Sequence, residues 1–393
     1  MKELSRIASA VQASTTMAID AMFKQMKADG VDVIGFGAGE PDFNTPDNIK
    51  AAGIAAIEQN VTRYTPAAGT VELRQAVCGR MKADYGLEYK PSQVVVSSGA
   101  KHLVYLALRA VVNPGDEVIL PAPYWVSYIE LIKMVGGVPV VVTATEAEHF
   151  KLTAEKLSAA ITPRTKAILL NNPSNPTGMM YDREELEAIA AVCTQADIYV
   201  ISDEIYACLA YDGRTFTSFA SLSADAKERT ILVNGVSKAY AMTGWRIGYA
   251  CANDVIAKVM ANYVSHSTGS PVAISQRAAA VALSGSQAEI ETMRQAFEQR
   301  RNYIVERMNA IPGVSCIQPE GAFYVMMNLE QLLGKTIHGV EITNDDVFAD
   351  AFLKYGLVAV VPGSGFGAPN FVRWSYATSM ENIKAVSYTH LTL

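Results

Sequence analysis

Between about residue 92 and residue 285, the chain repeats one pattern of strand, turn and helix. The expected strands are short apolar runs at 94–98, 117–120, 138–142, 166–170, 198–202 and 230–233. Continuous apolar strands that alternate with helices are typical of a mostly parallel sheet with helices on both faces. In such sheets ligands bind beyond the carboxyl ends of the strands, so the residues there are the first candidates for a functional site.

The C-terminal part of the chain has a different character. A long charged helix is expected from Gln287 to Ala310, and short strands are expected at 322–327, 358–361 and 371–375. This pattern predicts an α+β second lobe, and 393 residues are more than a single hydrophobic core usually serves.

We therefore expect three parts along the chain. They are an N-terminal segment (1–45) that packs with the small domain, a large domain (46–285) and a small C-terminal domain (286–393). A terminal helix should begin with Ser379 as its N-cap, and its pattern should break after about residue 384, where the helix is expected to be truncated or replaced.

Charge and composition exclude several classes of protein. The net charge of -6 and the pI near 5.5 argue against a nucleic-acid partner bound through electrostatics. No apolar run is long enough to span a membrane, and the N-terminus does not resemble a signal peptide. The five scattered cysteines, without a CxxC pair, indicate reduced thiols in a cytoplasmic protein and no metal site.

One lysine, Lys238, stands out in a turn of small residues after the strand that ends near Asn234. A lysine in such a place can act as an amine nucleophile if its surroundings lower its pKa. Ser237 and Arg246 beside it are residue types that hold a phosphate. A lysine with a phosphate site predicts a phosphate-bearing aldehyde bound as a Schiff base, which is pyridoxal 5'-phosphate. A lone lysine after a strand is usually a surface residue, so the other strand ends must support this hypothesis.

Those strand ends carry the groups that this cofactor needs. Asp203 follows a buried strand and can keep a pyridine nitrogen protonated, while Tyr206 and Asn175 can bind the 3'-oxygen. A helix opens at Gly99-Ala100-Lys101 and offers backbone amides to the phosphate. Trp125 can provide an aromatic face for the ring.

Four segments together resemble one family. They are Asn172–Gly178 (NPSNPTG), Ser202–Tyr206 (SDEIY), Ser237–Gly248 (SKAYAMTGWRIG) and Phe371–Thr378 (FVRWSYAT). These segments resemble the class I/II aminotransferases, which have fold type I of the pyridoxal phosphate enzymes, and the similarity extends from about residue 3 to residue 384. The resemblance implies an α/β large domain with a mostly parallel seven-stranded sheet between helices, and a smaller α+β domain. Three shorter segments are similar to the bacterial aspartate aminotransferase branch, namely Ala38–Asp42, Arg63–Pro66 and Pro123–Tyr128.

The resemblance also implies roles for individual residues. Lys238 matches the lysine that forms the Schiff base and moves the proton. The matched cofactor-binding residues are Gly99, Ala100, Lys101, Trp125, Asn175, Asp203, Tyr206, Ser237 and Arg246. Tyr64 matches a tyrosine that reaches the phosphate in the neighbouring subunit, which implies a homodimer with shared active sites.

The substrate side follows from the same resemblance. Arg373 matches the arginine that binds the substrate α-carboxylate, and Gly39, Asn175 and Trp125 match residues that touch the substrate. Some family members read an acidic side chain with an arginine from the partner subunit, but the nearest segment here, 262–271, contains none.

In the bacterial branch a lysine beside the phosphate loop takes that task, and Lys101 stands at this place, with Thr16 as a possible helper. The implied substrates are small molecules, an L-amino acid and a 2-oxo acid, with aspartate and 2-oxoglutarate first. Prephenate or aromatic amino acids are the alternative. A lyase, decarboxylase or cyclising synthase of the same fold also stays open. A cofactor-binding domain of a transcription regulator is less favoured, because the similarity starts almost at Met1.

Overall fold

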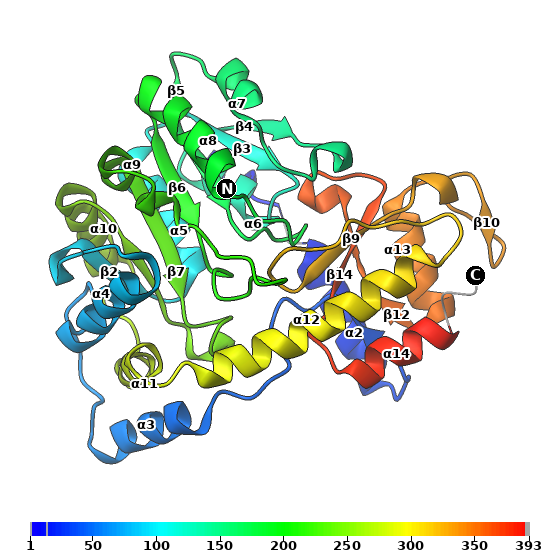
Figure 1. Cartoon of the computed structure of the whole chain (residues 1–393), viewed down its shortest axis with the longest axis horizontal. Helices are drawn as coiled ribbons and strands as arrows, with labels where there is room; N and C mark the ends of the chain where they lie inside the picture. Colours follow the sequence, from blue (N-terminus) through cyan, green and yellow to red (C-terminus); the bar gives the residue numbers. More distant parts are fainter. Residues whose placement is uncertain (1, 13–14, 390–393) are drawn as a thin grey trace.

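The computed structural model describes residues 2–12 and 15–389 of the chain (Figure 1). A seven-stranded sheet forms the centre of the large domain, with the strand order β2-β8-β7-β6-β5-β3-β4. Its strands are β2 (Val94–Ser97), β3 (Glu117–Ala122), β4 (Val138–Thr143), β5 (Thr165–Asn171), β6 (Tyr199–Asp203), β7 (Thr230–Gly235) and β8 (Gly248–Cys251). Strand β8 is antiparallel to both of its neighbours, and the other pairs are parallel. The predicted mostly parallel sheet is thus confirmed, although the sequence analysis had not separated β8 as a strand.

Helices cover both faces of this sheet, as Figure 1 shows. They are α4 (Val71–Tyr85), α5 (Ala100–Val111), α6 (Ser127–Met134), α7 (Ala154–Ala160), α8 (Arg183–Gln195), α9 (Ala224–Arg229), α10 (Asp254–Ser267) and α11 (Ala273–Ser284). Helix α3 (Asp47–Glu58) packs against α11 and not on the sheet itself. Alternate strand residues face opposite layers, because side chains along a strand alternate in direction. In β6, Ile201 joins the core under α5 and α10, whereas Val200 joins the core under α7 and α8.

The second part of the chain builds a smaller sheet, of three antiparallel strands in the order β13-β14-β9. The elements here are α12 (Ala288–Asn309), β9 (Tyr324–Asn328), β10 (Thr336–Ile337), β11 (Val340–Glu341), α13 (Asp345–Gly356), β12 (Val358–Ala359), β13 (Val361–Pro362), β14 (Phe371–Ser375) and α14 (Met380–Thr389). Figure 1 shows α12 running along the molecule from the large sheet toward the small one. Short 3-10 helices lie at 91–93, 146–148, 219–221, 243–245, 330–332 and 364–366.

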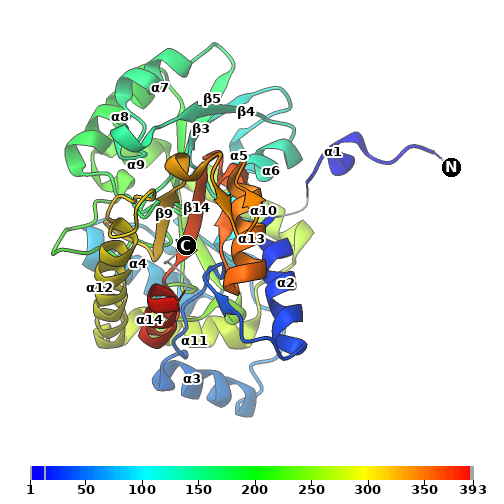
Figure 2. The same ribbon diagram turned by 90° about the vertical axis from the view of Figure 1, so that its right-hand side faces the viewer.

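The N-terminal segment contains α1 (Arg6–Ser9), α2 (Thr15–Ala28) and β1 (Ile34–Gly35). Strand β1 pairs in parallel with β12, and Val33 packs in one small core with Leu353 and Ala359. Figure 2 shows α1 at the outer edge of the molecule, near α6. Among the described residues, the chain has no helix with the length and apolar character needed to cross a membrane.

The terminal helix differs from its expected extent. Ser379 caps it as expected, since its Oγ accepts a hydrogen bond of 3.1 Å from the Asn382 N–H. The expected break after about residue 384 was wrong, because α14 continues to Thr389. Val386 lies three residues after Ile383 and is buried in the same core, so the apolar face of the helix extends beyond the expected boundary.

Candidate active site

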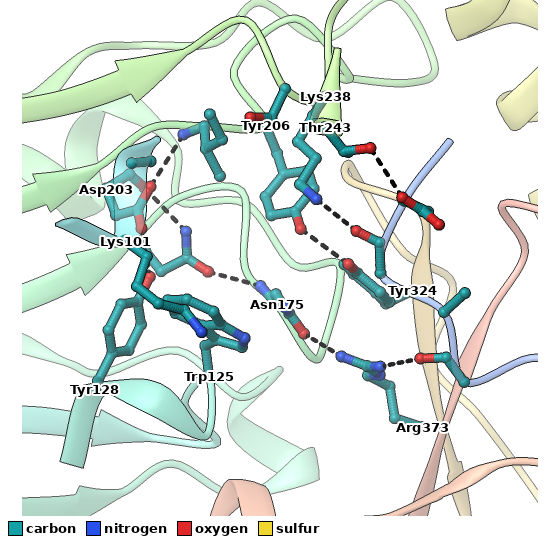
Figure 3. A pocket seen from close by; sticks show the side chains of 18 of the residues that line it. Lys101, Trp125, Tyr128, Asn175, Asp203, Tyr206, Lys238, Thr243, Tyr324 and Arg373 are labelled. Atoms are coloured by element: carbon teal, nitrogen blue, oxygen red, sulfur yellow. Dashed lines mark hydrogen bonds between the residues drawn. The ribbon is translucent and has the colours of Figure 1, made fainter. Parts of the chain in front are cut away.

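A cavity of about 400 Å³ opens at the carboxyl ends of β5, β6 and β7 (Figure 3). The N-terminus of α5 borders it on the side of the large sheet. Loop 37–40 and the strands β9 and β14 border it on the side of the small sheet. Within the described residues, no cluster of three or more His, Cys, Asp or Glu side chains could hold a metal ion.

Lys238 enters this cavity from the turn that follows β7. Its Nζ donates a hydrogen bond of 2.5 Å to the carbonyl oxygen of Gly39. Burial lowers the pKa of Lys238 from 10.5 to about 8, with Glu40 acting in the opposite direction and Arg246 adding to the decrease. The lowered pKa increases the neutral fraction of this amine at pH 7, and the neutral form is the one that acts as a nucleophile or base.

Asp203 ends β6 and faces the same cavity with an exposed fraction of only 3%. The Tyr128 hydroxyl donates to its Oδ2 at 2.7 Å, and the Ile205 N–H donates to its Oδ1 at 3.2 Å. Burial raises the pKa of Asp203 to about 6, and these hydrogen bonds oppose the increase. Within the described ranges of the chain this buried carboxylate has no ion pair, and such a group is suited to a protonated ring nitrogen.

The N-terminus of α5 and Arg246 both line the cavity and are suited to binding an anion. No side chain caps α5, so its first backbone amides are free of a cap and its positive dipole end points to the cavity. The Arg246 guanidinium donates to the Ser98 carbonyl oxygen at 3.1 Å. A Cβ on Gly99 would lie 2.5 Å from Nη2 of Arg246, so a larger residue there would displace the guanidinium. Amides of a helix N-terminus together with an arginine are a typical phosphate site.

Arg373 on β14 is a buried cation, with an exposed fraction of 2%. Its guanidinium donates to Asn175 Oδ1 at 2.9 Å and to the Gly37 carbonyl oxygen at 2.8 Å. Its carbon Cζ lies 4.5 Å from the ring centre of Tyr324 and 4.8 Å from that of Phe366. Its Nε is buried without a hydrogen-bond partner, and in the described part of the chain Arg373 has no ion pair. Because an unpaired buried charge is costly, this arrangement is suited to binding an anion from outside the chain.

Comparison with known proteins identifies the family. The family model for aminotransferase class I and II matches residues 31–387. The chain belongs to this family. It is 49% identical to an aspartate aminotransferase of Bacillus sp. (strain YM-2), over 98% of this chain and 97% of the relative. It is 48% identical to an aspartate/prephenate aminotransferase of Cereibacter sphaeroides, over 98% of this chain and 96% of the relative.

Solved structures agree with this assignment. An aspartate aminotransferase from Rhizobium meliloti superimposes with a TM-score of 0.95 at 42% identity, over 98% of this chain and 97% of that one. One from Thermus thermophilus, described with maleate, has a TM-score of 0.93 at 41% identity, over 100% of this chain and 99% of that one. These likenesses confirm the fold type I architecture expected for an aminotransferase.

Most residues predicted for the aminotransferase site come together in the cavity. Those that line it are Gly39, Ala100, Lys101, Trp125, Asn175, Asp203, Tyr206, Ser237, Lys238, Arg246 and Arg373. Gly99 lies directly behind them, against Arg246. Tyr64 lies outside the cavity and is fully exposed, and the side chain of Thr16, in the first turn of α2, lies outside the description.

Several lining residues of the aminotransferase were missed by the sequence reasoning, among them Glu40, Tyr128, Thr243 and Tyr324. Tyr128 stood at the end of a segment given above, three residues after Trp125, so its closeness to that predicted site residue was the available signal. Tyr324 had no comparable signal, because it reaches the cavity from β9, far along the chain.

Proposed function

We propose that this aminotransferase uses pyridoxal 5'-phosphate to transfer the amino group of aspartate to a 2-oxo acid, with 2-oxoglutarate as the expected acceptor. The observation that supports this most strongly is one cavity that holds Lys238, Asp203 and the unpaired cation Arg373. They supply a nucleophilic amine, a partner for a ring nitrogen and a carboxylate receptor. The reaction would then follow a ping-pong sequence, with two half-reactions at the same residues.

The lining residues fit this cofactor. When bound, it supplies an aldehyde and an electron-withdrawing ring. Asp203 would hold the ring nitrogen, Tyr206 and Asn175 the 3'-oxygen, and Trp125 the ring face. The phosphate would be held by Ser237, Arg246 and the amides that open α5, at Gly99, Ala100 and Lys101.

The chain's own residues can carry out the proton transfer. Lys238, with a pKa near 8, can take a proton from the substrate α-carbon and return it to the carbon on the other side of the substrate nitrogen. Arg373 and Asn175 would hold the α-carboxylate, and their mutual hydrogen bond fixes the guanidinium plane. Gly39 keeps this region open, since a Cβ there would lie 3.0 Å from the Tyr324 hydroxyl oxygen.

Lys101 supports a dicarboxylic substrate. It lines the cavity, and its Nζ lies 4.8 Å from the ring centre of Trp125. Burial lowers the pKa of Lys101, and Arg246 adds to this effect, so a second carboxylate would relieve the crowding of positive charge. The maleate named for the Thermus thermophilus relative is a dicarboxylate. The second candidate substrate is prephenate or an aromatic amino acid, and it is favoured by the relative named an aspartate/prephenate aminotransferase.

We also propose a cytoplasmic homodimer with shared active sites. Tyr64 is fully exposed, and large apolar side chains are exposed nearby in sequence or structure, at Ile54, Ile57, Val71 and Val272. A second copy of the chain would cover this surface and bring Tyr64 to the phosphate. The division into residues 1–45, 46–285 and 286–393 belongs to the same proposal.

The first experiment tests the cofactor and its lysine. The protein is purified with pyridoxal 5'-phosphate, reduced with borohydride and digested, and peptide masses locate the retained cofactor. We expect the cofactor on the Lys238 peptide in the wild type and none in Lys238→Ala, together with loss of nearly all turnover. Retained turnover in Lys238→Ala would refute the assignment.

A second experiment tests the substrate. Lys101→Ala is compared with the wild type, using aspartate and then phenylalanine as amino donors. We expect the loss in kcat/KM to be at least tenfold larger for aspartate, because only aspartate carries a second carboxylate. Equal losses for both donors would show that Lys101 does not recognise the substrate side chain. Equal turnover of both donors by the wild type would favour an enzyme of broader substrate specificity.

A further inference from the structure

Tyr324 occupies the junction of the two sides of the cavity, as Figure 3 shows. It is the first residue of β9, pairs with Ser375 of β14 and is completely buried. Arg373 lies two residues before Ser375 on that neighbouring strand, so the antiparallel register brings the tyrosine ring and the guanidinium together.

The Tyr324 hydroxyl contacts the cofactor side of the cavity. Its oxygen lies 2.9 Å from the hydroxyl oxygen of Tyr206, and both side chains are buried. Each phenol has one proton to donate. If Tyr206 donates to a ligand, Tyr324 is the donor that satisfies the Tyr206 oxygen. A hydrogen bond received in this way also makes Tyr206 a stronger donor, because linked hydrogen bonds polarise one another.

The Tyr324 ring contacts the carboxylate side. The Arg373 Cζ lies 4.5 Å from its centre, within the range of a cation–π interaction. Phe366 provides a second ring at 4.8 Å. Among the described residues, Asn175 and Gly37 provide the hydrogen-bond acceptors for the guanidinium, and the two rings restrict its orientation further.

We propose that Tyr324 is a positioning residue that couples the two sides of the site. Its hydroxyl orients Tyr206 toward the cofactor, and its ring orients Arg373 toward the substrate carboxylate. This inference rests on the proposed function, and it goes beyond it by joining two groups that would otherwise act separately. The two contacts use different atoms of one side chain, so they can be removed one at a time.

Tyr324→Phe removes the hydroxyl and keeps the ring. Absorption spectra of the bound cofactor are recorded against pH, and the pH midpoint of the spectral change is compared with that of the wild type. We expect this pH midpoint to rise by about half a pH unit, because a weaker hydrogen bond from Tyr206 stabilises the deprotonated form of the bound cofactor less. One neutral hydrogen bond supports a shift of this size. Affinity for maleate, an unreactive dicarboxylate, should stay within about twofold of the wild type.

Tyr324→Leu removes both contacts. We expect the same change in the pH midpoint and, in addition, an affinity for maleate about tenfold weaker, because the cation–π contact is lost. If the leucine variant does not fold, Tyr324→Met serves in its place. Tyr376→Phe is the matched control: this tyrosine is fully buried in the same core but is not among the cavity residues, so both readouts should equal those of the wild type.

The outcomes separate the two levels of inference. A wild type without any cofactor spectrum refutes the proposed function, and the role of Tyr324 falls with it. A normal wild-type titration with an unchanged midpoint in Tyr324→Phe overturns the role of the hydroxyl alone. Equal maleate affinities for the phenylalanine and leucine variants overturn the role of the ring. If Tyr376→Phe shifts the pH midpoint as much as Tyr324→Phe does, the shift reflects the loss of any buried phenol hydroxyl, and the positioning role of Tyr324 is overturned.

Discussion

Replacing Glu204 with glutamine should stabilise the protein at pH 8 relative to the wild type, with a much smaller effect at pH 4. This carboxyl group directly follows β6 and has no exposed surface. Its Oε1 accepts hydrogen bonds from the hydroxyls of Ser202 and Ser218 and from the Phe219 N–H, whereas its Oε2 is buried without a partner. Burial raises the pKa of Glu204 from 4.5 to about 7, against the effect of these hydrogen bonds.

The magnitude follows from the two pKa values. The folded protein binds the proton of Glu204 more tightly than the unfolded chain, so the stability of the folded state falls as the pH rises from 4.5 to 7. Below this range both states are protonated, and above it the folded state carries the whole cost of the buried charge. With 1.36 kcal/mol for each pK unit, the cost at pH 8 is about 3 kcal/mol. Glutamine keeps the shape and has no proton to lose, so its advantage should increase by this amount between pH 4 and pH 8.

The assay is urea unfolding of the wild type and Glu204→Gln at pH 4, 5, 6, 7 and 8. Both proteins are measured at the same concentration, because association changes apparent stability. Glu117→Gln is the control, since hydrogen bonds from Thr162 and Arg164 lower the pKa of Glu117 and its replacement should cost more at pH 7 than at pH 4. A difference between the wild type and Glu204→Gln that stays constant over this range would refute the reasoning.

Two further substitutions test the ends of the cavity. Arg373→Lys keeps the charge but loses the planar geometry with two donor nitrogens, so KM for aspartate should rise about tenfold or more. An unchanged KM would count against the binding of the substrate α-carboxylate by Arg373. Gly248→Ala places a Cβ 2.5 Å from the Ala100 backbone nitrogen and should displace the start of α5. Titration of the cofactor-free protein should then show at least tenfold weaker binding of pyridoxal 5'-phosphate. An unchanged titration would show that the α5 terminus is not part of the phosphate site.

Much of the fold could be predicted because its signals are local. The strands of the large sheet are apolar runs such as the one at β7, and each one is bounded by turns. Strand β8 was not predicted because it has four residues and directly follows the turn sequence after Lys238, whose glycines and arginine obscure the apolar pattern. The end of α14 was predicted too early for a different reason. Polar residues after 384 concealed an apolar spacing that becomes clear only when Ile383 and Val386 are seen in one core.

The candidate site was predictable where residues stand at strand ends. Asp203 and Lys238 follow buried strands of a parallel sheet, and that topology places them at one edge. Tyr324 could not be found in this way, because its place depends on the register between β9 and β14. Nor could sequence alone reveal that Arg373 has no ion pair among the described residues, since this depends on everything that packs around it.

The two principal charged groups of the site stand on different sheets. Arg373 belongs to β14 of the three-stranded sheet, and Lys238 follows β7 of the seven-stranded sheet. A ligand that binds both of them therefore acts as a cross-link between the two parts of the molecule, and its binding free energy opposes their separation. Such a ligand would make the two parts unfold together as one cooperative unit. A fragment that binds Arg373 alone would stabilise only the part that carries it.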